Sequence, residues 1–232
     1  MIRKMRIDKY ICQSTQLTRA EATACLQAGK VRLNGKRYTQ GAVQVYGDHE
    51  VTLEGKVLIL RPSRYMMVHK PKDTLCSNVD EVYPSIFHLV GVENAFDLHV
   101  AGRLDADTTG LVLVTDDGAW SHNIIMPNRQ CEKVYRVGLR DPITQSDIYQ
   151  LQEGVFLRGQ QQPTLPAKVE VVSEQEVLLT ITQGKFHQVK RMFRAVGNRV
   201  KTLHRQSIGG VQLNIDEGKW RYLTPEEIRL FQ

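Results

Sequence analysis

The strongest constraint on the fold is a short apolar run at residues 111–115, Leu-Val-Leu-Val-Thr, in the middle of the chain. An unbroken run of this kind between polar segments predicts a strand that is buried on both faces at the centre of a sheet. The polar, glycine-containing residues 101–110 come directly before it and include Asp105. A loop anchored to a buried strand is held rigidly, and such loops often carry functional groups.

Further strands are predicted on both sides of this run. Residues 65–69 form a strand pattern that ends at Lys70-Pro71, and residues 168–172 and 177–182 have the pattern of a hairpin. Residues 134–139 alternate so that Tyr135 lies on the same face as its apolar neighbours. Because helices interrupt these strands without a regular β-α-β order, the sequence predicts an α+β fold with a mostly antiparallel mixed sheet flanked by helices.

The first 60 residues follow a different pattern. Thr18 and Glu21 make a capping box that opens a helix, and this helix is expected to stop at Gly29. Asn34-Gly35 is a strong signal for a hairpin turn. These features predict a small α/β module of two helices and a short hairpin sheet. The pattern breaks around Pro62, so we expect a module at 1–60, a linker at 61–64 and a larger domain at 65–232.

Positive charge is concentrated in this module. The chain carries a net charge of +6, and residues 1–60 hold ten Lys or Arg against five Asp or Glu. Such asymmetry is what a segment needs to neutralise nucleic-acid phosphates, although a basic face kept only for solubility is an alternative. The basic residues that we expect to contact nucleic acid in this module are Arg6, Lys9, Arg19, Lys30 and Arg32.

The cysteines and apolar runs argue against several classes of protein. Cys12, Cys25, Cys76 and Cys131 are scattered without a Cys-x-x-Cys pair, so neither a zinc site nor a disulfide framework is expected. No apolar run approaches the roughly 20 residues that a membrane helix needs. We therefore expect a cytoplasmic protein with no metal ion and no membrane attachment.

A second basic segment follows residue 184. Its apolar residues recur at the spacing of a helix and are Val189, Met192, Phe193 and Val196. They predict an amphipathic helix over residues 186–196 that Gly197 closes. At about 100° per residue, Lys190 flanks the apolar stripe and points along its edge into a cleft. Arg191 and Arg194 lie further round, where they can meet phosphates or water.

Asp105 has two interpretations that compete with catalysis by a lone carboxylate. In a polar turn an aspartate often only braces the backbone. The spacing Asp105-Ala-Asp107-Thr108 also occurs in phosphoryl-transfer enzymes, in which one aspartate attacks phosphorus and magnesium lies between the pair. That chemistry usually places the aspartates at the C-terminal end of the apolar strand, whereas here the strand follows them. The order of loop and strand therefore disfavours a phosphatase.

Three segments in this order resemble the pseudouridine synthases. They are Gly-Arg-Leu-Asp-x-x-Thr-x-Gly-Leu at residues 102–111, Lys-x-Tyr at 133–135 and Gly-x-x-His-Gln-Val-Lys-Arg-Met at 184–192. The N-terminal module is similar to the RNA-binding fold of ribosomal protein S-four, in residues 6–11, 18–22 and 29–35. Residues 115–122 and 131–135 are most similar to the RsuA-type branch of the family, which acts on small-subunit (16S) ribosomal RNA.

This resemblance implies a cofactor-free isomerisation of uridine. The C1′–N1 bond breaks, the base turns in the site, and C5 bonds to C1′. The resemblance implies that Asp105 is the catalytic carboxylate, Tyr135 stacks on the uracil and accepts the C5 proton, and Lys190 is the charged partner of Asp105. Arg103 is expected to fill the gap left by the flipped nucleotide or to bind its phosphate. Further RNA contacts are expected from Lys185, Arg191 and Arg194.

The expected partner is 16S ribosomal RNA, either free or in a small-subunit assembly particle, and the protein is expected to act as a monomer. Two alternatives stay open at this point. One is a large-subunit ribosomal RNA enzyme of the same branch. The other is a non-catalytic ribosome-assembly protein, for which the basic module alone would suffice.

Overall fold

The computed structural model describes residues 4–93 and 95–232, so the first three residues of the expected module at 1–60 lie outside the described part, as does residue 94. The chain separates into two compact units. The first comprises Met1–Ser63 with Glu93–Asp97, and the second comprises Arg64–Val92 with Leu98–Gln232. The finer division into a module, a linker at 61–64 and a domain from residue 65 stays a prediction.

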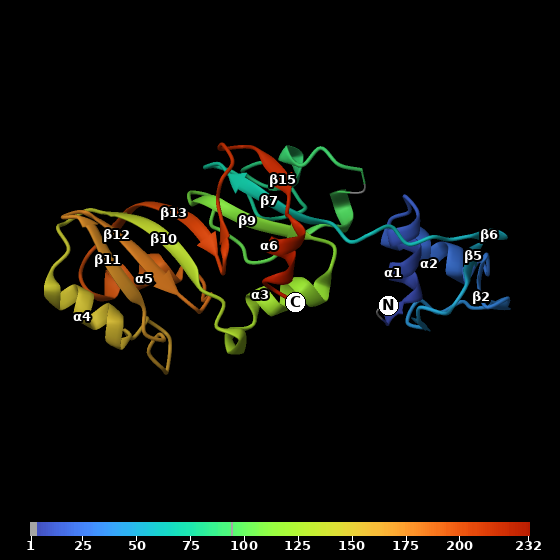
Figure 1. Ribbon diagram of the computed structural model, residues 1–232, viewed down its shortest axis with the longest axis horizontal. Coiled ribbons are helices and arrows are strands. Elements are labelled where there is room, and N and C mark those ends of the chain that lie inside the picture. Colours follow the sequence, from blue (N-terminus) through green and yellow to red (C-terminus); the bar gives the residue numbers. More distant parts are fainter. Residues whose placement is uncertain (1–3, 94) are drawn as a thin grey trace. The chain divides into compact units, whose positions relative to one another are not determined.

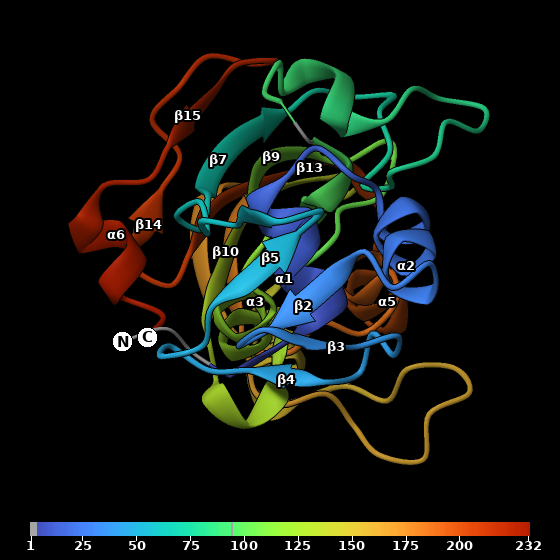
Figure 2. The same cartoon turned by 90° about the vertical axis from the view of Figure 1, so that its right-hand side faces the viewer.

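The first unit combines two helices with short antiparallel strands. Its elements are β1 (Met5–Arg6), α1 (Ile7–Ser14), α2 (Arg19–Gln27), β2 (Val31–Leu33), β3 (Lys36–Arg37), β4 (Gln44–Val45), β5 (Val51–Leu53), β6 (Lys56–Val57) and the short 3-10 helix η2 (Ala95–Asp97). β1 pairs with β4, and a four-stranded sheet has the order β3-β2-β5-β6. Figure 2 looks onto this unit, with β2 and β5 in front of α1. Ile7, Ile11, Leu26 and Val31 are fully buried in its core.

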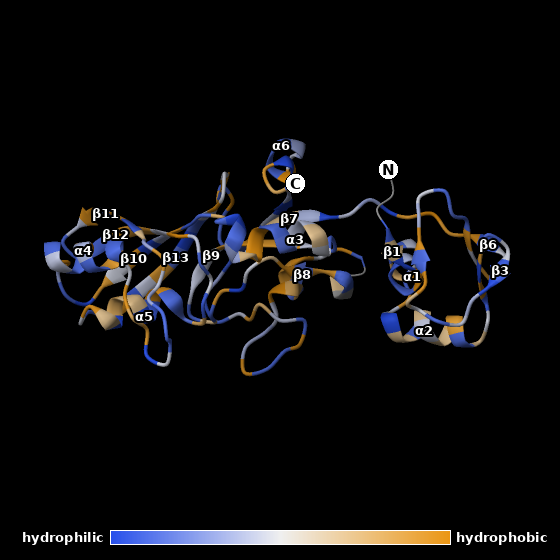
Figure 3. Cartoon of the chain, turned by 90° about the horizontal axis from the view of Figure 1, so that it is seen from below, coloured by the Kyte–Doolittle hydropathy of each residue, from blue (hydrophilic) through white to orange (hydrophobic). Residues whose placement is uncertain are grey.

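Local sequence signals explain these elements. Thr18 Oγ1 accepts a hydrogen bond from the Glu21 backbone N–H, and the Glu21 carboxylate accepts one from the Thr18 backbone N–H, as a capping box requires. Asn34 and Gly35 have φ values of 49° and 76°, the left-handed pair that a tight hairpin turn needs. In Figure 3, α2 carries hydrophilic and hydrophobic bands, in keeping with one buried side. The predicted helix and hairpin are thus confirmed.

The second unit is built on a nine-stranded sheet with the order β11-β12-β10-β13-β9-β7-β15, to which β14 and β8 add at β13 and β9. Figure 1 shows α4 and α5 beside the β10–β12 part of this sheet, and α3 and α6 beside the β9 part. The elements are β7 (Tyr65–Lys70), η1 (Ile86–Leu89), β8 (His99–Val100), β9 (Thr109–Thr115), α3 (Gly118–Ile125), η3 (Pro127–Arg129), β10 (Lys133–Leu139), α4 (Gln145–Glu153), β11 (Lys168–Ser173), β12 (Glu176–Ile181), α5 (Gln188–Ala195), β13 (Val200–Ile208), β14 (Val211–Gln212), β15 (Trp220–Tyr222) and α6 (Pro225–Arg229).

The apolar run at residues 111–115 is the central strand β9, as predicted. Leu111, Val112, Leu113 and Val114 are all 0% exposed, so both faces of the strand are covered. β9 pairs antiparallel with β7 and parallel with β13. Every other strand pair of this sheet, within the described residues, is antiparallel. The α+β fold with a mostly antiparallel sheet is confirmed.

The predicted alternation of β10 is also confirmed. Tyr135, Val137 and Leu139 are buried on one face, whereas Arg136 is exposed on the other. The helix expected at residues 186–196 is shorter, because α5 begins only at Gln188. His187 before it has a φ of 47°, which no right-handed helix can include. Among the described residues, no helix is long and apolar enough to cross a membrane.

The parallel contact between β9 and β13 depends on a glycine. Gly110 lies opposite Arg205 in this pair and has a φ of 112°. A Cβ atom at Gly110 would lie 2.3 Å from the backbone oxygen of Arg205 and 2.6 Å from its nitrogen. Neither atom can move without separating the strands. A side chain is therefore excluded here both by the positive φ and by this clash with the backbone of Arg205.

We therefore expect Gly110→Ala to lower the free energy of unfolding by about 3 kcal/mol, because it combines backbone strain with a clash inside the sheet. Gly118→Ala is the matched control, since a Cβ there meets open space. The control should change stability by less than about 1 kcal/mol. Urea unfolding followed by circular dichroism measures both variants. Equal midpoints for Gly110→Ala and the unsubstituted protein would contradict this account.

Candidate active site

The loop between β8 and β9 lies at a deep cleft of about 690 Å³ in the second unit. Residues of this loop form one wall, and the segment that leads into α5 forms another. The cleft brings together Asp105, Tyr135 and Lys190, which lie far apart in the sequence. The three residues singled out from separate motifs therefore line one cavity.

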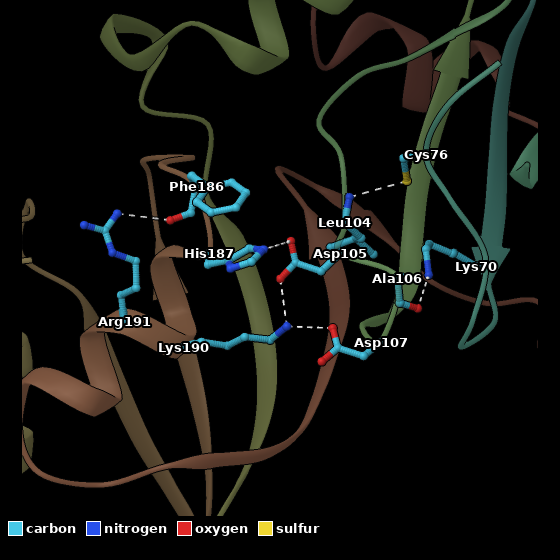
Figure 4. Close-up of polar contacts among 10 residues, drawn as sticks. All are labelled: Lys70, Cys76, Leu104, Asp105, Ala106, Asp107, Phe186, His187, Lys190 and Arg191. Carbon is cyan, nitrogen blue, oxygen red and sulfur yellow. Dashed lines mark hydrogen bonds and ion pairs between the residues drawn. The ribbon is translucent and has the colours of Figure 1, made fainter. Parts of the chain in front are cut away.

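Lys190 on α5 is shared by two carboxylates (Figure 4). Its Nζ donates to Asp105 Oδ2 at 2.8 Å and to Asp107 Oδ1 at 2.6 Å. Burial alone lowers the pKa of Lys190, but the two carboxylates outweigh burial and raise it. Burial likewise raises the pKa of Asp107, but the hydrogen bond and charge of Lys190, together with a backbone hydrogen bond and His187, lower it overall. The side chain of Asp105 is 28% exposed and that of Asp107 is 59% exposed, so Asp105 is the better protected carboxylate.

His187 contacts the other oxygen of the Asp105 carboxylate. The distance from its Nε2 to Asp105 Oδ1 is 3.3 Å. The left-handed backbone of His187 is a costly conformation for a residue with a side chain. It turns the ring toward Asp105 just before α5 starts, as Figure 4 shows. Asp105 is thus held from two sides by the same segment of the chain.

The backbone of the Asp105 loop rests on a buried lysine. Lys70 at the end of β7 is 0% exposed, and its Nζ donates to the carbonyl oxygens of Pro71 at 2.9 Å, Ala106 at 3.0 Å and Thr108 at 2.8 Å. Burial lowers the pKa of this lysine, and nearby acidic groups oppose that shift. The Leu104 backbone N–H donates to Cys76 Sγ at 3.4 Å from another side. These contacts fix the main chain on both sides of Asp105.

Tyr135 forms part of the cleft floor beside a buried arginine. Tyr135 is 7% exposed and Arg205 is 1% exposed. The guanidinium donates to Leu111 O at 2.8 Å, to Gly102 O at 2.9 Å and to Tyr135 Oη at 3.4 Å. Arg205 therefore joins the loop, the central strand and the floor of the cleft. It also directs positive charge at the tyrosine hydroxyl.

The other predicted RNA-contacting residues of this unit have different surroundings. Arg103 is exposed and Lys185 half-buried, and both line the cleft. Arg194 is exposed on α5. Arg191 instead donates to the backbone oxygens of Phe186 at 3.2 Å and Arg158 at 2.5 Å, so it braces the segment that precedes α5.

The basic residues predicted in the first unit are all exposed: Arg6, Lys9, Arg19, Lys30 and Arg32. Several of them have partners within that unit. Arg6 and Arg19 converge on the buried Asp8 carboxylate at 2.6 and 3.5 Å. Burial raises the pKa of Asp8, but these arginines and a backbone hydrogen bond lower it overall. Lys30 pairs with the Glu54 carboxylate at 2.7 Å.

Sequence reasoning missed two residues that line the cleft, His187 and Arg205, and one that supports its loop from below the surface, Lys70. A signal for Arg205 exists in the period-two pattern of β13. Leu203, Arg205 and Ser207 lie at every second residue on its buried side. Lys70 gives no local signal, since the two loop carbonyl oxygens that it supports, those of Ala106 and Thr108, lie more than thirty residues away. Within residues 4–93 and 95–232, no cluster of His, Cys, Asp or Glu could hold a metal ion.

Comparison with known proteins agrees with this geometry. The RNA pseudouridylate synthase family pattern matches residues 64–195, and the S4 domain pattern matches residues 5–51. A Vibrio cholerae protein named ribosomal small subunit pseudouridine synthase A is 47% identical over 226 residues, which cover 97% of this chain and 98% of that protein. Its Escherichia coli namesake is 43% identical over 227 residues, again covering 97% and 98%. A crystal structure of a pseudouridylate synthase is 44% identical, with a TM-score of 0.73, and covers 98% of this chain and 100% of that one.

The cleft brings Asp105, Tyr135 and Lys190 together, and the relatives are similar over nearly the whole length, so the chain belongs to the RNA pseudouridylate synthase family. It is a pseudouridine synthase with an S4 domain, the RNA-binding module expected from its first residues. This removes the phosphatase and the purely non-catalytic RNA-binding protein as alternatives.

The support that Lys70 gives to the Asp105 loop leads to a prediction. Lys70→Met keeps the length of the side chain but leaves buried carbonyl oxygens without a donor. We expect a loss of stability of about 3 kcal/mol and at least a tenfold loss of turnover. Lys72→Met is the control, since Lys72 is exposed two residues away. Urea unfolding and a uridine-isomerisation assay measure both effects, and wild-type behaviour of Lys70→Met would show that the loop does not need this lysine.

Proposed function

We propose that this enzyme isomerises a specific uridine of small-subunit (16S) ribosomal RNA, with Asp105 as its catalytic carboxylate. The observation that carries the assignment of the residue is the ion pair between Asp105 and Lys190 in the cleft that Tyr135 also lines. The name of the relatives from Vibrio cholerae and Escherichia coli supports the choice of RNA. No metal ion or organic cofactor is needed for the reaction described below.

In the proposed reaction, the C1′–N1 bond of the uridine breaks while its electrons stay with the base. Asp105 either attacks the electron-poor centre or stabilises its positive charge, and one carboxylate is enough because no water has to enter. Lys190 and His187 orient the two oxygens of this carboxylate. The freed uracil then turns, and C5 bonds to C1′.

Tyr135 is proposed to act on the base. Its ring can stack against the uracil, and its hydroxyl can accept the proton that leaves C5 after the new bond has formed. A proton must also be added to N1, so the net change is an isomerisation with no atom gained or lost. The Arg205 guanidinium donates to the Tyr135 hydroxyl and so fixes the position of its oxygen for this role.

RNA binding is proposed to use basic residues of both units. The target nucleotide must leave the base stack, which costs a few kcal/mol. Arg103 is placed to fill the vacated space or to bind the flipped phosphate. Further phosphate contacts are proposed for Lys185 and Arg194 in the second unit, and for Arg191 in addition to its bracing contacts with Phe186 and Arg158. In the first unit they are proposed for Arg6, Lys9, Arg19, Lys30 and Arg32. We further propose that the enzyme works as a monomer in the cytoplasm, on free RNA or on an assembling small subunit.

A tritium-release assay on 16S RNA labelled at C5 of uridine tests the assignment of Asp105. We expect release without added metal and a fall of at least about 1,000-fold in Asp105→Asn, because the amide can neither attack nor balance positive charge. RNA affinity should be retained. Asp107→Asn is the matched control, since Asp107 shares the same lysine but is more exposed. The rate of tritium release by Asp107→Asn should fall by less than about tenfold.

Full release by Asp105→Asn would refute the catalytic assignment. Release from large-subunit RNA alone would identify the large-subunit alternative. Mapping pseudouridine in ribosomal RNA from cells that lack this protein identifies the target nucleotide.

The proposed role of Tyr135 predicts a change in an isotope effect. In Tyr135→Phe the ring still stacks, but the proton acceptor is gone. We expect slower turnover and a larger ratio of kcat values for uridine protonated and deuterated at C5, because proton removal becomes the slow step. Rapid quenching with labelled RNA measures this ratio. A normal rate with an unchanged ratio would assign proton removal to another group.

A further inference from the structure

The cleft carries an aromatic side chain that the reaction above does not use. Phe186 lines the cleft but is 76% exposed, among the largest exposed fractions of any apolar side chain in the described residues. Large apolar side chains at such positions commonly mark a contact surface. Figure 4 shows the ring beside His187, at the wall of the cleft that carries Lys190.

The Phe186 ring is held in place on one side. It stacks on the His187 ring with a centroid separation of 3.7 Å and an interplanar angle of 21°. Its backbone oxygen accepts from Arg191 Nη1, and the backbone N–H of the preceding Lys185 donates to the Gln188 side chain at 2.9 Å. In the part of the chain that the structure describes, His187 is the one ring that stacks on Phe186. One face of the phenyl ring is therefore covered and fixed while the side chain as a whole stays accessible.

We propose that Phe186, backed by His187, is a stacking platform for a nucleobase next to the target uridine, an inference that rests on the proposed RNA substrate. A base has a flat π face that matches the ring, and stacking of this kind needs no particular base identity. Because His187 also contacts Asp105 Oδ1 at 3.3 Å, two stacked side chains, Phe186 and His187, link a base on the platform to the catalytic carboxylate. The platform thus positions the RNA strand relative to the reacting sugar.

The base that we propose on Phe186 is a neighbour of the target uracil and not the target uracil itself. Tyr135 is 7% exposed and Arg205 is 1% exposed, and the proposed reaction assigns the target uracil to the space beside Tyr135. Phe186 lines the same cleft but is 76% exposed, so it is accessible to a base outside the space beside Tyr135. Lys185 and Arg103 line the same cleft and supply positive charge for the backbone phosphates. This charge favours RNA over an apolar protein partner as the occupant.

A double-mutant cycle between the protein and the RNA tests the platform. The variant is Phe186→Leu, which keeps apolar volume but removes the π face. The substrates are a fragment of small-subunit RNA that contains the target uridine, and two copies with an abasic ribose on its 5′ or 3′ side. With intact RNA we expect KM to rise about tenfold at nearly unchanged kcat. With one of the abasic copies, Phe186→Leu should raise KM by no more than about twofold.

Two controls make the result specific. Phe186→Trp should retain the wild-type KM, because it keeps a larger π face. Tyr149→Leu removes an aromatic ring that is 63% exposed on α4 and does not line the cleft, so its KM should not change. The same affinities are measured by filter binding in an Asp105→Asn background. This binding readout tests the platform even if isomerisation of this RNA fails.

The proposal would be overturned if Phe186→Leu lost the same amount of affinity for the intact RNA and for both abasic RNAs. It would also be overturned if the affinity for the intact RNA did not change. A loss in kcat alone would overturn it too, because it would place Phe186 in the chemical step. Absence of turnover by the unsubstituted enzyme, together with the expected pattern of affinities, would instead reject the proposed substrate and keep the platform.

Discussion

The close approach of β9 to β13 at Gly110 is the constraint on which the cleft depends. The glycine lets the backbone of Arg205 come within a distance that any side chain would block. The guanidinium of the same arginine can then reach Gly102, Leu111 and Tyr135. One tight strand contact thus sets the distance between the loop that carries Asp105 and the strand that carries Tyr135.

Buried cations outnumber carboxylates around this cleft. Lys70, Lys133 and Arg205 are each at most 6% exposed, whereas both aspartates of the loop are partly exposed. Burial lowers the pKa of Lys133 and Lys70, and their hydrogen bonds go to backbone oxygens. The lysine closest to the carboxylates is the exception, since its pKa is raised. A low-dielectric site with an excess of positive charge suits a polyanionic substrate.

Much of the fold and part of the site could be predicted from the sequence, because those features are local. The alternation of β10 placed Tyr135 inward, and the stripe of α5 placed Lys190 at a cleft edge. The start of α5 was predicted too early because the left-handed backbone of His187 is set by its surroundings. Lys70 could not be found, since its role consists of hydrogen bonds to carbonyl oxygens 36 and 38 residues away. Phe186 occupies an unspecified position of the motif at residues 184–192, so the sequence did not reveal that its ring stays exposed.

Lys70 also supports the backbone of the Asp105 loop without a dissolved ion. Three carbonyl oxygens at 2.8 to 3.0 Å surround its ammonium group, much as such oxygens surround a bound potassium ion. The charge here is covalently tethered, so it cannot dissociate when the ionic composition of the solvent changes. Salt therefore acts on the phosphate contacts of the RNA rather than on the shape of the catalytic loop, and the slope of affinity against salt concentration counts those contacts directly.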